Sequence, residues 1–464
     1  MRNWTKRLDM GMARVIMALA WPTMLEQLMQ TAVQYIDTAM VGSLGTAATA
    51  AVGATTTVGW LIGGMVSAFG VGFLSFIARA CGANDRAAAA RASAQAVIVT
   101  LAAGVVFTAV TLSLSGLVPV WMQVDEAIRA TASQYFFILY LPMLPRAATI
   151  IFGTVLRAAG DTKTPMKVGV WVNIINVVLN FLLIYPTRTL TLWDFTFTMP
   201  GAGLGVVGAA AASAVAVTVG GVYITIVLWR HPLISPRGER LRPDWHILRP
   251  TFRVALPNML QRFGTSLGYV AFASMINGLG ETATAAHTVA NTVESAFYIP
   301  GYGMQTAAAT LAGNAYGAGD RKRMERLARM FIPIEIGLMI LSGGLLFFLA
   351  EPLVRLFSTD EVVIRLGRTV LQMVAVSEPF YGFSIIVEGL MQGVGRTKQP
   401  FLFNVAGMWL VRIVGTLICT TFFFTDGGSG LIAAWACMIA HNLLLFGLFL
   451  YCFLRGTWNP LRER

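Results

Sequence analysis

The stretch GDTKTP (160–165) returns as GRTKQP (395–400), 235 residues later. At the same offset, CGANDR (81–86) returns as YGAGDR (316–321), and Pro22 corresponds to Pro257. The register runs from Pro22 to Pro165 without a net gap, which chance does not produce over so many landmarks. Two copies of one hydrophobic unit are typical of pores and transporters whose substrate path lies between the copies.

Composition places these copies in a membrane. Of the 464 residues, 56% are hydrophobic and 12% are charged, against about 25% charged in an average soluble protein. Charge-poor runs long enough to cross the bilayer recur along the chain, and they do not alternate polar with apolar residues as barrel strands do. We therefore predict an all-α integral membrane protein with twelve transmembrane helices, near residues 13–42, 47–78, 92–120, 131–157, 165–187, 203–230, 250–278, 283–315, 328–350, 366–393, 400–424 and 429–454.

The net charge of +12 is distributed in alternate loops. Basic clusters include Arg2, Lys6 and Arg7 at the start and 321–329 in the second copy, whereas the intervening loops are short or of mixed charge. Because basic loops stay in the cytoplasm, we expect both termini to be cytoplasmic in a multi-pass protein of the cell inner membrane. The same distribution argues against nucleic-acid binding.

An even number of helices per copy inserts both copies the same way up, as parallel repeats. We predict an N-terminal six-helix lobe at 1–229, a cytoplasmic linker rich in Pro and Arg at 230–253, and a C-terminal six-helix lobe at 254–464. The substrate path is expected where the two lobes meet.

Asp37, in the first predicted helix, is the strongest functional candidate. No neighbour in the sequence neutralises it, and the matching position in the second copy is Phe272. An acid in hydrocarbon is costly, so its presence suggests a function. It could cycle between protonated and charged forms, or coordinate Na⁺ together with neutral oxygens. A structural salt bridge to a partner distant in the sequence is the alternative.

Asn173, Asn176 and Asn180 share one face of the fifth helix, because they lie at i, i+3 and i+7. Three amides in a row can hydrogen-bond a carboxylate or supply oxygens to a cation. A structural hydrogen-bond zipper between helices is the bland alternative. The second copy carries no amide at the equivalent positions, so this stripe, like Asp37, belongs to the first copy alone.

Other polar residues are weaker candidates. Arg262 in the seventh helix pairs with Glu294 in the eighth, gates the path or receives an anion, with a structural ion pair favoured. Pro22 is a candidate helix hinge. Glu388 is expected to reach interfacial water, and two further intramembrane acids, Glu335 and Glu378, are expected to be structural. Pro379, directly after Glu378, is a candidate kink.

The sequence contains no motif typical of a soluble enzyme. The four histidines show no metal-ligand spacing, the four cysteines form no C-x-x-C motif, and no phosphate-binding loop is present. We therefore expect no enzymatic activity, no cofactor and no metal beyond a Na⁺ at Asp37. Transport must draw on an ion gradient.

Twelve helices in two copies, the paired turns GANDR and GAGDR, the paired GDTKTP and GRTKQP, and Asp37 together resemble the multidrug and toxic compound extrusion (MATE) family over residues 10–455. The resemblance implies two lobes in a V shape, alternating access, a monomer, and export of cationic or amphiphilic compounds in exchange for H⁺ or Na⁺. It also places a cation site in the N-terminal lobe at Asp37, with Asn176 and Asn180 as polar partners.

Two departures refine that resemblance. Some relatives in the DinF-like branch carry Asp where this chain has Asn180, so a Na⁺ site here has one charge fewer, which favours H⁺. NorM-like members carry an acid where this chain has Tyr381, so a second cation site in the C-terminal lobe is not expected, and the pattern is closer to the DinF-like branch. The rival function is a lipid-linked precursor flippase, for which Arg262 with Arg146 and Arg412 gives thin support.

Overall fold

The chain is almost entirely helical in the computed structural model, which describes residues 10–122, 124–192 and 195–462. The basic residues Arg2, Lys6 and Arg7 lie outside the described residues. The helices of the first half are α1 (Met10–Gly42), α2 (Thr46–Gly82), α3 (Arg86–Leu114), α4 (Val118–Trp121), α5 (Glu126–Tyr140), α6 (Met143–Ala158), α7 (Lys163–Leu183) and α8 (Gly205–Arg230).

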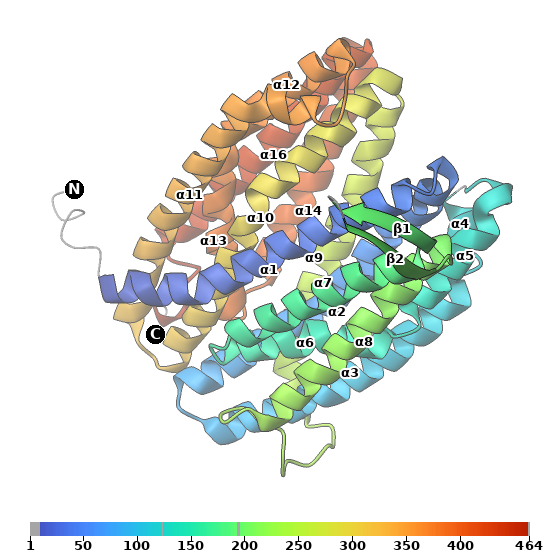
Figure 1. The fold of residues 1–464 in the computed structure, drawn as a ribbon. Coiled ribbons are helices and arrows are strands. Elements are labelled where there is room, and N and C mark those ends of the chain that lie inside the picture. Colours follow the sequence, from blue (N-terminus) through green and yellow to red (C-terminus); the bar gives the residue numbers. More distant parts are fainter. Residues whose placement is uncertain (1–9, 123, 193–194, 463–464) are drawn as a thin grey trace. The chain divides into compact units, whose positions relative to one another are not determined.

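The second half repeats this order (Figure 1). Its helices are α9 (Trp245–Asn277), α10 (Glu281–Gly317), α11 (Arg321–Arg355), α12 (Glu361–Ala375), α13 (Glu378–Gly393), α14 (Lys398–Ala406), the π-helix η1 (Gly407–Ile413), α15 (Val414–Ile418), the π-helix η2 (Cys419–Phe423), α16 (Gly427–Arg455) and the short 3₁₀ turn η3 (Pro460–Arg462).

The repeat seen in the loops is a repeat of whole helices. An offset of 235 residues carries the bounds of α1 onto those of α9, and the bounds of α2 onto those of α10. The pair α5–α6 bends by 50° and its counterpart α12–α13 bends by 52°. The positive φ of Gly160 (89°) matches that of Gly395 (82°), at turns that only glycine adopts without strain.

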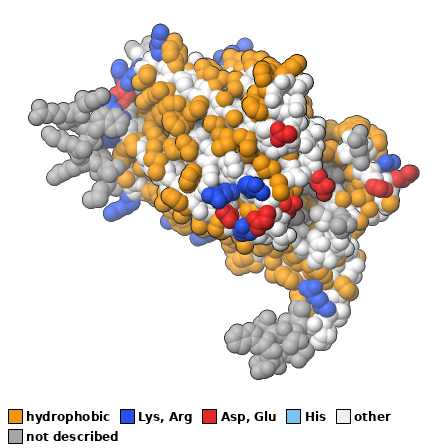
Figure 2. Space-filling view, turned by 90° about the horizontal axis from the view of Figure 1, so that it is seen from above, with side chains coloured by type: hydrophobic (Ala, Val, Ile, Leu, Met, Phe, Trp, Pro, Cys, Tyr) orange, Lys and Arg blue, Asp and Glu red, His pale blue; other side chains and the backbone are white. Residues whose placement is uncertain are grey.

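Twelve long helical segments are present among the described residues, as predicted. Seven are long and apolar enough to cross a membrane, and the two bent pairs bring the number to nine. The other three are α1, α9 and α10, whose sequences carry more polar groups, such as the arginines of α9. The prediction of an all-α integral membrane protein is confirmed. Figure 2 shows hydrophobic side chains over much of one face, as a lipid-facing surface requires.

One hairpin departs from the helical pattern. Strands β1 (Pro186–Leu192) and β2 (Phe195–Ala202) pair antiparallel after α7, with Thr189 opposite Thr198. Strands were not expected, because the membrane runs are too long and do not alternate polar with apolar residues; this hairpin lies in a loop between two such runs. This loop alternates threonine with larger residues, which is a strand pattern.

The chain divides into two compact units, one comprising the chain up to Gln27, 74–85 and 250–464, and the other 28–73 and 86–249. Helices α1 and α2 thus contribute to both units. The lobes predicted at 1–229 and 254–464 stay a prediction.

In the unit that contains the C-terminal half, the end of α2 crosses the end of α10 at unusually short range. A Cβ on Gly82 would meet the carbonyl oxygen of Asn314 at 2.0 Å, and a Cβ on Gly317 would meet that of Arg79 at 1.9 Å. The two approaches are equivalent by the repeat. Small residues thus allow the two copies of this helix to meet, as helices in lipid require.

In the other unit, α8 packs against α6 and α7, and β2 lies beside α7 (Figure 1). A small core at one end joins α1, α7 and α8 through Met40, Val41, Ile184, Val206 and Ala209. This core fixes the part of α1 that carries Asp37 against the part of α7 that carries the amides.

Candidate functional site

Asp37 and Asn180 are in direct contact. The Asn180 amide nitrogen Nδ2 donates to Oδ1 of Asp37 at 2.6 Å. Asn180 is fully buried, whereas Asp37 is half-buried. The hydrogen bond to an ionised acceptor is of the stronger kind, so α1 and α7 are joined at this point by more than packing.

Asn176 completes a second contact to the same acid. In the orientation that satisfies its neighbours, its amide nitrogen lies 2.8 Å from Oδ1 of Asp37 and its oxygen accepts from the Ser213 hydroxyl at 2.9 Å. Ser213 comes from α8 and was not predicted, because a single serine in an alanine-rich helix gives no signal. Helices α1 and α7 therefore meet at one carboxylate, and α8 holds one of the two amides that contact it.

Asn173 has a different position. It is nearly buried, but its nitrogen has no hydrogen-bond partner among the described residues, and no contact with Asp37 is seen. Of the three amides predicted to share one helical face, two therefore contact Asp37.

No salt bridge neutralises Asp37 within the described part of the chain, so the structural alternative raised from the sequence finds no support there. The oxygen Oδ1 of Asn180 is buried and likewise has no partner among those residues. A carboxylate beside an unsatisfied amide oxygen can hold a proton or take part in coordinating a small cation with neutral oxygens.

One aromatic residue of α5, Tyr135, packs near the part of α1 that carries Asp37. It lies against the core that contains Met40 and Val41, one turn after Asp37. The guanidinium of Arg146 lies over the ring of Tyr140, 5.4 Å from its centroid, and donates Nη2 to the carbonyl of Leu139 at 3.1 Å. The cation of α6 is thus directed toward a ring and a backbone carbonyl.

The predicted pairing of Arg262 with Glu294 is not what the described residues show. Arg262 donates Nε to Asn258 one turn earlier in α9, at 3.2 Å. The cation that interacts electrostatically with Glu294 is Arg412, from the π-helix η1. The pairing was wrong because sequence spacing could not indicate which helix faces Glu294.

Arg412 occupies the second copy's counterpart of the Asp37 region. Its guanidinium lies 4.1 Å from the ring centroid of Phe272, the residue equivalent to Asp37, and 4.8 Å from that of Tyr269. Arg412 is only 3% exposed. The acid and amides of the first copy are thus matched by a cation and aromatic rings in the second.

Tyr381 belongs to an aromatic cluster. Its hydroxyl shares a hydrogen bond of 2.8 Å with the hydroxyl of Tyr302, and its ring meets the ring of Tyr298 edge to face, with centroids 6.2 Å apart. The position therefore serves packing and hydrogen bonding between α10 and α13.

Three other intramembrane acids lie in the unit that contains the C-terminal half. Glu388 accepts from Gln261 at 2.8 Å, from Gln392 at 3.0 Å and from Asn404 at 3.2 Å. Glu388 was expected to reach interfacial water, but three side-chain amides contact its carboxylate instead. Glu335 and Glu378 are buried, and Glu335 has no hydrogen-bond partner for either carboxyl oxygen among the described residues.

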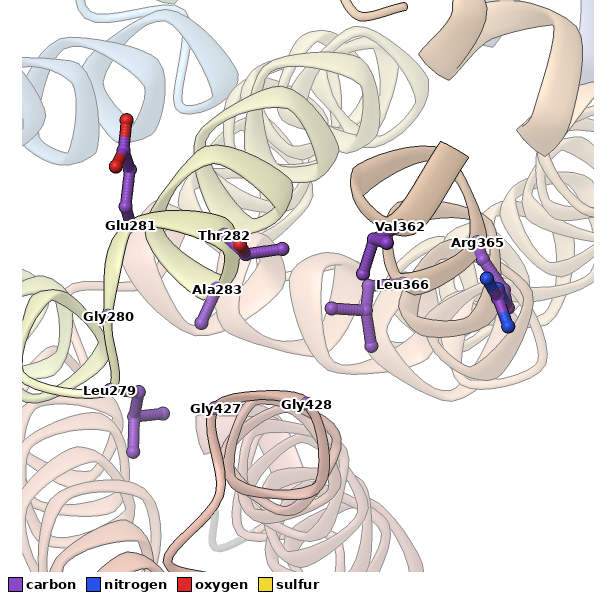
Figure 3. A pocket seen from close by; sticks show the side chains of 10 residues that line it. All are labelled: Leu279, Gly280, Glu281, Thr282, Ala283, Val362, Arg365, Leu366, Gly427 and Gly428. Atoms are coloured by element: carbon purple, nitrogen blue, oxygen red, sulfur yellow. The ribbon is translucent and has the colours of Figure 1, made fainter. Parts of the chain in front are cut away.

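A cavity of about 440 Å³ lies where α10, α12 and α16 begin (Figure 3). Figure 3 shows Glu281 and Arg365 on opposite sides of it, with Val362 and Leu366 between them. None of the predicted site residues lines this cavity. It is a surface feature separate from the Asp37 contacts.

Comparison with known proteins gives one consistent result. The family model described as MatE matches residues 22–182 and 257–418, one block in each copy of the repeat. A "Probable multidrug resistance protein NorM" of Thermotoga maritima is 27% identical over 444 residues, covering 96% of this chain and 92% of that protein.

Two solved structures match the fold over nearly the whole chain. One is reported as an outward-facing conformation of a multidrug resistance MATE family transporter, at 23% identity and TM-score 0.87, covering 97% of this chain and 96% of that one. The other is a transporter of the MOP superfamily from Pyrococcus furiosus, whose reversed binding-pocket polarity is taken to suggest a different function. It is 24% identical, has TM-score 0.87, and covers 97% of both chains.

Proposed function

Because the chain belongs to the multidrug and toxic compound extrusion (MATE) family, we propose that it exports small cationic or amphiphilic compounds in exchange for a cation that binds at Asp37. Members of this family are membrane transporters and not enzymes. The relative in Thermotoga maritima bears a multidrug resistance name, which supports the drug-like substrate class.

The observation that carries the proposal is the setting of Asp37. Two amides and no basic side chain among the described residues contact it. A carboxylate paired with Lys or Arg would stay charged, whereas one held by amides can be neutralised by an incoming cation. We favour H⁺ over Na⁺, because Asn180 supplies an amide where some DinF-like relatives supply a second acid.

The proposed cycle follows from the cost of a charge in hydrocarbon. A cation from outside binds at Asp37, removes the charge, and lowers the free energy of rearranging the N-terminal lobe of 1–229 against the C-terminal lobe of 254–464. Pro22 lies inside α1 on the chain leading to Asp37 and is proposed as the hinge of this alternating access. Substrate is then released outside.

The protein is proposed to act as a monomer in the inner membrane, with both termini in the cytoplasm. The alternation of basic and mixed loops supports this orientation. It places the β1–β2 hairpin and the start of α16 outside the cell membrane, and the basic start of α11 inside.

Reconstitution in liposomes tests the proposal. A pH gradient and a Na⁺ gradient are imposed separately, and movement of a fluorescent cationic dye is followed. We expect one gradient, the pH gradient, to drive dye movement in the wild type but not in Asp37→Asn. Tyr381→Phe, in the second copy, is the matched control and should retain transport.

Dye movement by Asp37→Asn at the wild-type rate would refute the role of Asp37. If the folded wild type moves no dye under either gradient, a lipid-linked precursor flippase becomes the better account. The assay would then be repeated with fluorescent lipid-linked substrates.

A further inference from the structure

A second pocket, of about 560 Å³, lies between the end of α11 and α12. Its lining combines aromatic side chains, Phe347 and Phe348, with polar ones, Glu351, Arg368 and Gln372. None of these residues takes part in the contacts around Asp37, and the proposed transport cycle does not use them.

An ion-pair network forms the polar wall of this pocket. Arg355 donates to Glu351 at 3.0 and 3.2 Å and to Glu361 at 2.8 and 3.2 Å, so most of its N–H groups are engaged. Arg368 donates only Nη1, to Glu351 at 2.9 Å. Its other N–H groups bond to no described residue, and its side chain is 50% exposed.

Gln372 and Glu351 present oxygen acceptors to the pocket. Gln372 donates its nitrogen to the carbonyl of Phe347 at 3.3 Å, which leaves its amide oxygen without a partner among the described residues. Glu351 is 37% exposed beside Arg368. The pocket therefore offers free guanidinium donors next to the amide oxygen of Gln372 and next to Oε2 of Glu351, which accepts a single hydrogen bond.

The apolar wall continues along α11. Leu341, Leu345 and Phe348 lie at i, i+4 and i+7 on one helical face and are 66%, 49% and 80% exposed. In a membrane such a face contacts acyl chains. Arg355 ends the helix at the depth where charged side chains meet the headgroups, so the pocket lies at the boundary between hydrocarbon and headgroup.

We propose that this pocket binds the headgroup of a zwitterionic phospholipid that carries a primary amine. The phosphate accepts from the free N–H groups of Arg368, since a guanidinium matches phosphate oxygens in geometry and charge. The ammonium donates to the Glu351 carboxylate and the Gln372 oxygen. One acyl chain lies along Leu341, Leu345 and Phe348.

The mixed charge of the wall selects this headgroup. An anionic headgroup without an amine would meet the Arg368 donors but leave Glu351 facing a second negative group. In the orientation proposed above, the pocket belongs to the outer leaflet. The binding site itself does not depend on the transport mechanism.

Native mass spectrometry of the full-length protein tests the proposal. The protein is released from detergent micelles that contain equal amounts of phosphatidylethanolamine and phosphatidylglycerol. We expect the wild type to retain one phosphatidylethanolamine preferentially, and Arg368→Gln to lose at least half of that retention. Arg365→Gln is the matched control, because Arg365 lies one turn away on the same helix but lines the other cavity.

The proposal is overturned if the wild type retains no lipid, if it retains the two lipids equally, or if Arg368→Gln and Arg365→Gln lose retention equally. Competition by soluble glycerophosphoethanolamine at the same concentration would also contradict a membrane lipid as the ligand. Dye transport is measured on the same samples, so that failure of lipid binding is distinguished from failure of the transport proposal.

Discussion

At the scale of single residues, the two copies of the repeat differ in charge at the position of the proposed cation site. Asp37 contacts Asn180 and Asn176 in the first copy. The equivalent of Asp37 is Phe272, which packs under the guanidinium of Arg412. The same position of the repeat is thus an acid, Asp37, in the first copy, and an aromatic residue, Phe272, beside a cation in the second.

The residue contacts predict how a second acid would alter coupling. Asn180→Asp places another carboxylate against Asp37, so the pair attracts Na⁺ more strongly, by about tenfold or more in affinity at the distances of neighbouring charges. We expect dye transport by this variant to become responsive to a Na⁺ gradient. The measurement is gradient-driven dye movement in liposomes.

Asn173→Asp is the control for this substitution, because Asn173 lies on the same face of α7 without contacting Asp37. It should leave the ion preference unchanged. An equal gain of Na⁺ response in both variants would mean that the added charge acts through the general field and not through the Asp37 contact.

Sequence reasoning identified Asp37, Asn176 and Asn180 because an acid and amides in hydrocarbon stand out against apolar neighbours. It did not identify Ser213, since one small hydroxyl in a run of alanines carries no such contrast. It also misassigned the partner of Glu294, because contacts between helices depend on rotation about the helix axis, which hydropathy does not specify.

At the scale of elements, the crossing of α2 and α10 depends on glycine. We expect Gly317→Ala to destabilise the protein by about 1–3 kcal/mol, because its Cβ would meet a backbone carbonyl that cannot move aside. The midpoint of thermal unfolding in detergent, followed by intrinsic tryptophan fluorescence, measures the effect.

Gly337→Ala is the matched control, since a Cβ at this helical position meets nothing within 4 Å. Its melting temperature should be unchanged or higher, as helix propensity predicts. A melting temperature for Gly317→Ala equal to that of the control would show that the two helices can separate without cost.

The start of α16 carries a cap that should respond to pH. The hydroxyl of Ser429 and its backbone N–H donate to the Asp426 carboxylate, and they hold the pKa of this group below its usual value. A lowered pKa in the folded state means that the cap stabilises at neutral pH and is lost as pH falls through that lowered value. We expect Asp426→Ala to speed amide hydrogen exchange across 427–433 at pH 7.

The difference in exchange between Asp426→Ala and the wild type should shrink as the pH falls and the Asp426 carboxylate becomes protonated. Asp426→Asn, which keeps an acceptor oxygen, should stay close to the wild type throughout this pH range. A difference for Asp426→Ala that persists undiminished once the wild-type carboxylate is protonated would contradict a cap made by the ionised group.

The boundaries of the elements were largely predictable. The turns at Gly160 and Gly395 are visible in the sequence as glycines at a fixed offset. They mark helix ends, so the boundaries of the neighbouring helices could be predicted. The bend within α12–α13 falls where Pro379 follows Glu378, the site predicted for a kink. The bend within α5–α6 was not predicted, because the apolar run continues through it. The β1–β2 hairpin was missed because it lies in a loop outside the membrane runs.

At the scale of the whole molecule, twelve helices in two copies give a symmetric scaffold with an asymmetric set of polar groups. The MatE family model matches both copies, while the acid contacted by α7 amides occurs in the first alone. We therefore propose that cation coupling belongs to the first copy. The second copy contributes the aromatic cluster of Tyr298, Tyr302 and Tyr381.

Cation movement driven by substrate tests this assignment most directly, because coupling between two ligands is reciprocal. Liposomes containing the protein are given a gradient of a cationic substrate and no ion gradient, and internal pH is followed with a trapped dye. The account predicts proton movement opposite to the substrate in the wild type and in Tyr381→Phe, and none in Asp37→Asn. Proton movement that persists in Asp37→Asn, with the protein folded, would contradict it.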